Sequence, residues 1–169
     1  MRKGRFADPG AGAPRAMDEA LRLLSYRQYS TSELQKKLRS RGCAEEEISG
    51  AVRRLTELGY LDDEALARGL ALSRIRQRRW GRIKVACLLK RRGIASEVAD
   101  RVIDEIDATE ELNAAREVLE RWLRRNDPGG TFSRDVAMRA MRHLRSRGFS
   151  SSTVSSVINR PDDPCCYDE

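Results

Sequence analysis

A five-residue motif recurs three times in this chain and constrains its fold more than any other feature. LRSRG occupies Leu38–Gly42, LKRRG occupies Leu89–Gly93, and LRSRG returns at Leu144–Gly148. The three glycines are 51 and 55 residues apart. Recurrence at a nearly fixed period is typical of tandem structural repeats, in which each repeat is one supersecondary unit. We therefore interpret the chain as three copies of one unit.

The residues after each glycine repeat as well. Apolar residues stand six and ten positions beyond the glycine, at Ile48 and Val52, at Ala99 and Ile103, and at Val154 and Ile158. A spacing of four residues places both on one helix face. Basic residues favour the negative end of a helix dipole, and a glycine just beyond the last turn is a common left-handed cap. The motif thus predicts the end of one helix, a short link and the start of the next helix.

Each copy also contains a leading helix, so the sequence predicts three sets of three helices. The leading helices are predicted at Met17–Tyr26, Asp63–Arg78 and Glu110–Arg125, and the middle helices start near Ser30, Gly81 and Ser133. Ser30 and Glu33 have the spacing of a capping box. We expect Thr109 to cap the third leading helix. The alternating pattern typical of β-strands is missing.

These features predict an all-α protein of three tandem three-helix repeats that form an elongated, curved array. The predicted ranges are a tail at 1–16, repeats at 17–62, 63–108 and 109–160, and an acidic tail at 161–169. Glycine and proline in the first tail, and proline and acidic residues in the second, favour disorder. A unit of about 50 residues buries only a limited core, so we expect contacts between neighbouring repeats to contribute to stability.

The residue patterns give no support to catalysis or to a bound cofactor. Cys43, Cys87, Cys165 and Cys166 lack the spacing of zinc ligands, and His143 is the single histidine, which we expect on a solvated surface. Glycine-rich phosphate loops and catalytic triads are missing. No stretch reaches the roughly 20 apolar residues of a membrane span. We predict a monomeric, cytoplasmic, non-enzymatic protein with no cofactor and no metal.

The acidic trio Asp62-Asp63-Glu64 precedes a predicted helix and has two interpretations. It resembles part of a cation site, but an aspartate at a helix start also accepts hydrogen bonds from free backbone N–H groups. We favour the helix cap.

Positive charge is concentrated in one segment of the chain. The formal net charge is +7, and the segment Ala65–Ser96 contains ten Lys or Arg residues but no Asp or Glu. Solvated helix faces usually mix both signs. We therefore predict an anion-facing surface. The candidate partner-binding or DNA-binding residues are Arg68, Arg74, Arg76, Arg78, Arg79, Trp80, Arg82, Lys84, Lys90, Arg91 and Arg92.

Trp80 and Gly81 interrupt this basic run. If the helix continues past them, Arg74, Arg78 and Arg82 share one face. If the helix breaks there, the arginines lie at a corner between two helices. Trp80 itself has two interpretations, because its ring either stacks on a base or ribose or packs between repeats.

Several segments resemble the RecX regulatory family. The most specific is Leu58-Gly59-Tyr60-Leu61-Asp62-Asp63, which follows the Ser32-Glu33-Leu34 helix, and Trp80-Gly81 and LKRRGI fit the same pattern. The resemblance extends over Met17–Arg160. In the third copy it is carried by LRSRGF and the helix of Val154 and Ile158.

The resemblance implies tandem three-helix repeats that bind the RecA recombinase in the groove of its filament on single-stranded DNA. Filament extension, ATP hydrolysis, strand exchange and co-protease activity would then fall. The implied partners are the RecA protein filament and single- and double-stranded DNA, and the implied roles are regulation of homologous recombination, DNA repair and the SOS response. Two alternatives from the residues alone are a stand-alone helical DNA-binding module and an adaptor that holds other proteins.

Overall fold

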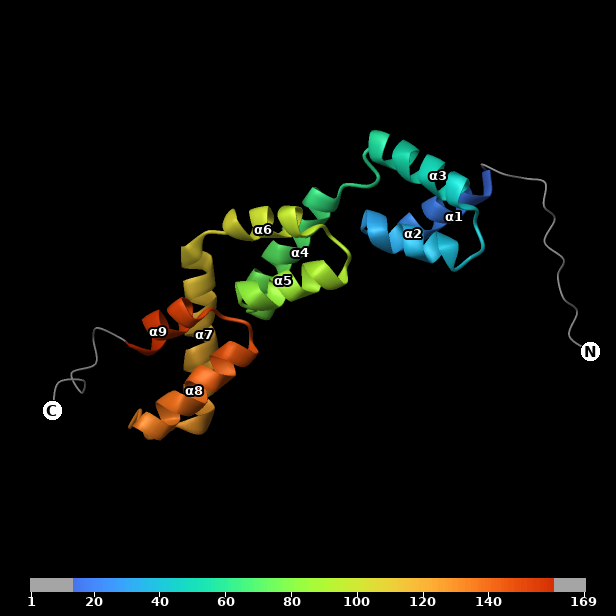
Figure 1. Ribbon diagram of the computed structural model, residues 1–169. Helices are drawn as coiled ribbons and strands as arrows, with labels where there is room; N and C mark the ends of the chain where they lie inside the picture. The colour runs from blue at the N-terminus through green and yellow to red at the C-terminus, as the bar shows by residue number, and fades with distance from the viewer. Residues whose placement is uncertain (1–13, 160–169) are drawn as a thin grey trace, which may run out of the picture. The chain divides into compact units, whose positions relative to one another are not determined.

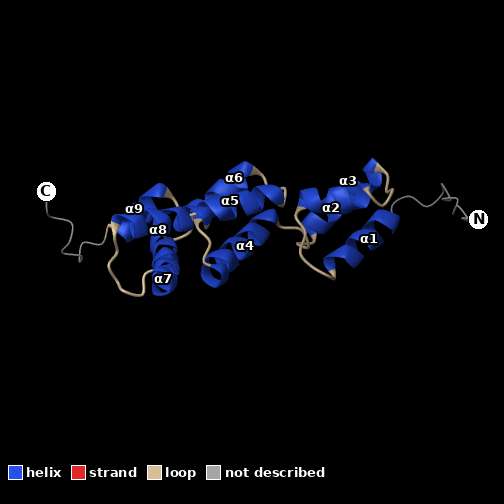
Figure 2. Ribbon diagram, turned by 90° about the horizontal axis from the view of Figure 1, so that it is seen from below, coloured by secondary structure: helices blue, strands red, loops and turns tan. Residues whose placement is uncertain are grey.

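The computed structural model describes residues 14–159, which fold into nine α-helices (Figure 1). They are α1 (Pro14–Leu24), α2 (Thr31–Arg39), α3 (Glu45–Glu57), α4 (Asp63–Arg78), α5 (Arg82–Arg91), α6 (Ser96–Asp104), α7 (Ala108–Asn126), α8 (Arg134–Ser146) and α9 (Ser151–Ile158). Within this range Figure 2 shows helices and loops but no strand. The predicted all-α fold of three-helix sets is therefore confirmed.

The helices belong to two compact units. The first unit comprises the described residues up to Leu66 together with Arg92–Ile94, and the second comprises Ala67–Arg91 and the described residues from Ala95 onward. In the first unit α1, α2 and α3 each pack against the other two. In the second unit α7, α8 and α9 do the same, and α5 packs against α6. The predicted repeat ranges divide the chain differently and stay a prediction.

Capping side chains determine two helix starts as the sequence predicted. The Ser30 hydroxyl accepts the Glu33 N–H at 3.1 Å, and the Glu33 carboxylate accepts the Ser30 N–H at 3.4 Å, which completes the capping box. At the acidic trio, the Asp62 carboxylate accepts the N–H groups of Glu64 and Ala65 at 3.0 and 2.9 Å. The cap interpretation of Asp62 is therefore confirmed.

Two predicted helix starts were wrong. Helix α1 begins at Pro14, three residues inside the predicted tail, because proline has the fixed φ of a first helical turn and needs no N–H partner there. The rest of that tail and the C-terminal tail lie outside the described residues. Helix α7 is capped by Asp107, whose carboxylate accepts the Thr109 N–H at 2.9 Å. This backbone hydrogen bond is the main reason that the pKa of Asp107 is lowered.

Apolar side chains, most of them aliphatic, fill the cores of both units. The core of the first unit contains Ala20, Leu23, Leu34, Leu38, Ile48, Leu55 and Leu61. In the second unit Phe149 is the largest fully buried side chain, and Leu89, Leu119 and Leu144 are buried as well. Each of the leucine, isoleucine and phenylalanine side chains among them contributes about 1.5–3 kcal/mol when it leaves water completely.

The glycines of the repeated motif end the middle helices as predicted. Gly42, Gly93 and Gly148 have positive φ values of 78°, 71° and 84°. The residue after the glycine then donates back to the last helical turn, from Cys43 to the Leu38 carbonyl and from Phe149 to the Leu144 carbonyl, each at 3.3 Å. This is the hydrogen-bond pattern of a left-handed helix cap.

Two of these glycines also let another helix start approach closely. In the first unit, a Cβ on Gly93 would overlap the side chain of Ser32 in α2. In the second unit, a Cβ on Gly148 would overlap Lys84 in α5. The Ile83 N–H of α5 donates to the Gly148 carbonyl at 3.1 Å. The start of a middle helix thus packs directly on a glycine link in both units.

Candidate functional site

The basic run turns a corner at Trp80. Helix α4 ends at Arg78 and α5 begins at Arg82. Between them Arg79 has a positive φ of 53°, which L-residues rarely adopt. The Trp80 N–H donates to the Arg74 carbonyl at 3.2 Å and closes the turn. The alternative of one continuous helix carrying three arginines on one face is therefore wrong, and the arginines lie at a corner between two helices.

Four arginines of the run form ion pairs with carboxylates at the end of α6 and in α7. Arg68 pairs with Glu105 at 2.9 Å, Arg76 with Glu110 at 2.5 Å, Arg79 with Glu117 at 2.5 Å, and Arg82 with Glu111 at 3.4 Å. The hydrogen bond from Arg68 is the main reason that the pKa of Glu105 is lowered. The segment without acids is therefore not a uniform surplus of positive charge, because distant acids balance part of it.

The remaining candidate cations fall into two groups. Arg92 lies in the first unit, where it pairs with Glu33 at 2.9 Å and donates to the Gln28 carbonyl at 2.9 Å. Five cations, all in the second unit, make no ion pair with any described residue. These are Arg74, Arg78, Lys84, Lys90 and Arg91.

We call Arg74, Arg78, Trp80 and Lys84 the Trp80 corner. The indole is half-buried, with the Lys84 ammonium 4.8 Å and the Arg74 guanidinium 5.8 Å from the ring centroid. Cations at these distances are attracted to an aromatic face. Arg78 lies four residues after Arg74 and is exposed. The structure thus places two cations that lack a carboxylate over one half-exposed ring, and Arg78, which also lacks one, follows one helical turn after Arg74.

A buried glutamate from α7 holds this corner in place. Glu111 is only 4% exposed. Its carboxylate accepts the Arg82 backbone N–H at 3.0 Å, which caps the start of α5, and the Thr153 hydroxyl of α9 at 3.2 Å. Sequence reasoning missed this residue, because a glutamate in the first turn of a helix usually faces solvent.

Asp63 has a matching role in the first unit. Its carboxylate accepts the backbone N–H of Thr31, the first residue of α2, at 2.8 Å. In both units an acid in the first turn of a leading helix therefore caps a middle helix. This shared arrangement is a tertiary counterpart of the sequence repeat.

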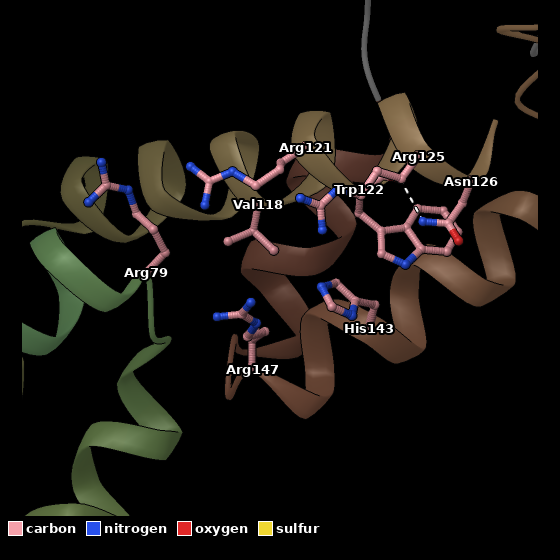
Figure 3. Close-up of a pocket in the computed structure, with 8 residues that line it drawn as sticks. All are labelled: Arg79, Val118, Arg121, Trp122, Arg125, Asn126, His143 and Arg147. Carbon is pink, nitrogen blue, oxygen red and sulfur yellow. Dashed lines mark hydrogen bonds between the residues drawn. The ribbon is translucent and has the colours of Figure 1, made fainter. Parts of the chain in front are cut away.

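A second basic cluster surrounds a pocket of about 150 Å³ in the second unit (Figure 3). Among its lining residues are Arg79, Arg121, Trp122, Arg125, His143 and Arg147. Figure 3 shows α7 carrying Trp122 on one side and α8 carrying His143 on the other. The two rings stack with centroids 6.1 Å apart and an interplanar angle of 27°.

His143 is therefore not the solvated surface residue that the sequence suggested. It is half-buried, and burial, followed by the nearby charge of Arg147, lowers its pKa from the usual value of 6.5. The sequence contained no local signal for this stack, because Trp122 and His143 belong to different helices.

The described residues offer neither a cluster of metal ligands nor a helix able to cross a membrane. No group of three or more His, Cys, Asp or Glu side chains lies together there as a metal ion would require. None of the described helices is long and apolar enough to cross a membrane.

Comparisons with known proteins match the chain along nearly all of its described length. Models of the first, second and third three-helix domains of RecX match residues 16–55, 62–103 and 109–158. A Thermus thermophilus protein named Regulatory protein RecX is 40% identical over 134 residues, which cover 79% of this chain and 83% of that protein. A Chlorobaculum tepidum protein of the same name is 32% identical and covers 85% of this chain and 86% of its own length.

The fold is also that of a solved structure. The crystal structure of RecX from Lactobacillus salivarius superposes with a TM-score of 0.79 at 21% sequence identity, covering 85% of this chain and 92% of that chain. Domain matches, relatives and fold agree, and the chain belongs to the RecX family of regulatory proteins.

Proposed function

We propose that this protein is a non-catalytic negative regulator of the RecA recombinase. It binds the RecA filament on single-stranded DNA in the cytoplasm and lowers ATP hydrolysis, strand exchange and co-protease activity. Membership of the RecX family supports the proposal, since the three domain matches follow one another along the chain and the relatives carry the name Regulatory protein RecX.

The Trp80 corner is the proposed contact surface. Its three cations pair with no described carboxylate, so an acidic protein surface or a phosphate group would meet charge that is not yet balanced. The arginines that already pair with α7 acids are expected to maintain the corner rather than to contact the filament. When several weak contacts form along one filament, each raises the effective concentration for the next, so a small contact surface is sufficient for tight overall binding.

The test is the rate of ATP hydrolysis by RecA on single-stranded DNA while this protein is titrated in. The expected result is a fall at ratios well below one molecule per RecA protomer, with the DNA already coated by RecA. If the rate falls only when the protein competes for bare DNA, the protein is a stand-alone DNA-binding module and not a filament regulator.

Charge reversal tests the contact surface. Arg74→Glu, Arg78→Glu and Lys84→Glu together are expected to weaken inhibition at least tenfold, because each replaces an unpaired cation by an anion. The matched control reverses Lys36, Lys37 and Arg53, three exposed cations of the first unit without an ion pair in the described residues. Equal inhibition by both triple variants would place the contact outside the corner.

A further inference from the structure

The pocket between α7 and α8 collects positive charge without a balancing acid among its lining residues. Arg121 and Arg125 come from α7, and Arg147 directly follows α8 (Figure 3). Neither Arg121 nor Arg125 makes an ion pair with a described residue. Among the described residues, the Arg147 guanidinium donates to the Arg78 carbonyl, at 3.4 Å, and to no carboxylate. Three guanidinium groups without a carboxylate thus surround one small pocket.

Helix dipoles account for part of this charge. Arg125 lies in the last turn of α7 and Arg147 caps α8, positions where a cation faces the negative end of a helix. Arg121 lies a full turn before Arg125, and the dipole effect falls off within the last turn. The third guanidinium and the aromatic pair therefore need another explanation.

The aromatic pair gives the pocket a flat wall beside the guanidinium groups. The Trp122 indole is half-buried and stacks on His143, and the Asn126 amide holds the local backbone by donating to the Trp122 carbonyl at 2.7 Å. Nucleobases stack on such rings, while arginines bind the adjacent phosphates. An acidic peptide would use the arginines but would gain nothing from the ring.

We propose that this pocket binds one nucleotide unit of a single-stranded nucleic acid. The phosphate contacts Arg121, Arg125 and Arg147, and the base stacks against Trp122. A volume of about 150 Å³ accommodates part of a single nucleotide. A base inside a duplex is also already stacked and does not reach a protein ring. The site requires no RecA, so it goes beyond the regulatory function and is tested on the protein alone.

The first measurement uses Trp122 as its own reporter. The chain has two tryptophans, so Trp80→Phe leaves Trp122 as the single indole. A single-stranded oligothymidylate is expected to quench its fluorescence, and a duplex of the same length is expected to quench it less. An unchanged emission spectrum at saturating oligothymidylate would overturn the proposal.

The second measurement assigns the phosphate contacts through salt dependence. Arg121→Gln and Arg125→Gln are each expected to lower the slope of log K against log salt by about 0.7, the value for one phosphate contact on a single strand. Binding is followed by the anisotropy of a labelled oligothymidylate. Arg116→Gln is the matched control, because Arg116 is exposed on α7 but does not line the pocket. Equal slopes in all three variants would refute the assignment.

The third measurement separates nucleotide recognition from a general attraction to acids. Trp122→Ala is expected to weaken oligothymidylate binding by roughly 5- to 100-fold, and Trp122→Phe, which keeps a ring in the core, by less. A polyglutamate peptide of equal charge is the competing probe. If it binds as tightly as the oligonucleotide and ignores the Trp122 variants, the pocket is an acidic-peptide site and the proposal fails. RecA inhibition by the Arg121→Gln variant is measured separately. The failure of the nucleotide site can then be distinguished from a failure of the proposed regulatory function.

Discussion

Replacement of the buried Glu111 by alanine should destabilise the second unit more than replacement of an exposed acid of α7 does. Glu111 is buried, and it links three helices by accepting the Arg82 N–H of α5 at 3.0 Å and the Thr153 hydroxyl of α9 at 3.2 Å. The Arg82 guanidinium is its charge partner at 3.4 Å. The substitution removes all of these contacts at once.

The magnitude follows from what is left without a partner. A buried donor that loses its acceptor costs about 1–3 kcal/mol. Breaking a fully buried ion pair costs about 3–5 kcal/mol, but the Arg82 side chain keeps 25% exposure, so water compensates in part. We expect Glu111→Ala to lower the free energy of unfolding by about 3 kcal/mol. Glu111→Gln keeps an acceptor for the Arg82 N–H and should cost about 1 kcal/mol.

Urea unfolding followed by tryptophan fluorescence is the appropriate assay. Both tryptophans, Trp80 and Trp122, lie in the second unit, so their emission reports that unit. With a slope of about 2 kcal/mol per M, a loss of 3 kcal/mol lowers the urea midpoint by about 1.5 M. Circular dichroism detects the helices of both units. The part of its signal that comes from the first unit should keep its urea midpoint in the Glu111→Ala variant.

The control is Glu117→Ala, which removes an acid from the same helix. The Glu117 side chain is 47% exposed and pairs with Arg79, and such surface pairs contribute about 0–1 kcal/mol. If Glu111→Ala shifts the midpoint no further than Glu117→Ala does, the buried carboxylate does not hold the corner and the reasoning is wrong.

Two further predictions concern stability. Gly148→Ala should lower the free energy of unfolding by about 2–4 kcal/mol, because a positive φ strains alanine and the added Cβ overlaps Lys84. Gly42→Ala, with a positive φ but open space around the Cβ, should lower it by only about 1 kcal/mol. Urea unfolding of both variants checks this, and equal losses would contradict it. The pKa of His143 is lowered in the folded protein, so the unfolded chain binds the proton more tightly and stability falls as pH drops below 6.5. His143→Gln should therefore reduce the difference in urea midpoint between about pH 7.5 and about pH 5.5, and an unchanged difference would assign that pH dependence to other groups.

Local physics explains why so much of the fold was predictable. The capping box at Ser30, the apolar spacing after each motif and the glycine caps depend on residues within one or two turns of each other. The positive φ of Gly42, Gly93 and Gly148 followed from a motif that places basic residues before a glycine. The helix break at Trp80 was one of two alternatives that the sequence left open, because neither Trp80 nor Gly81 forbids a helix.

The sequence by itself thus determined the number of helices, the caps made by Ser30, Asp62 and the motif glycines, and the threefold repeat. Only the tertiary structure decided which charges of the basic run are free, because the acids that bind Arg68, Arg76, Arg79 and Arg82 lie 29 to 38 residues further along the chain. It also decided that Glu111 is buried and that Trp122 meets His143 across two helices. Such contacts depend on how helices pack, and packing is set by the whole core rather than by neighbouring residues.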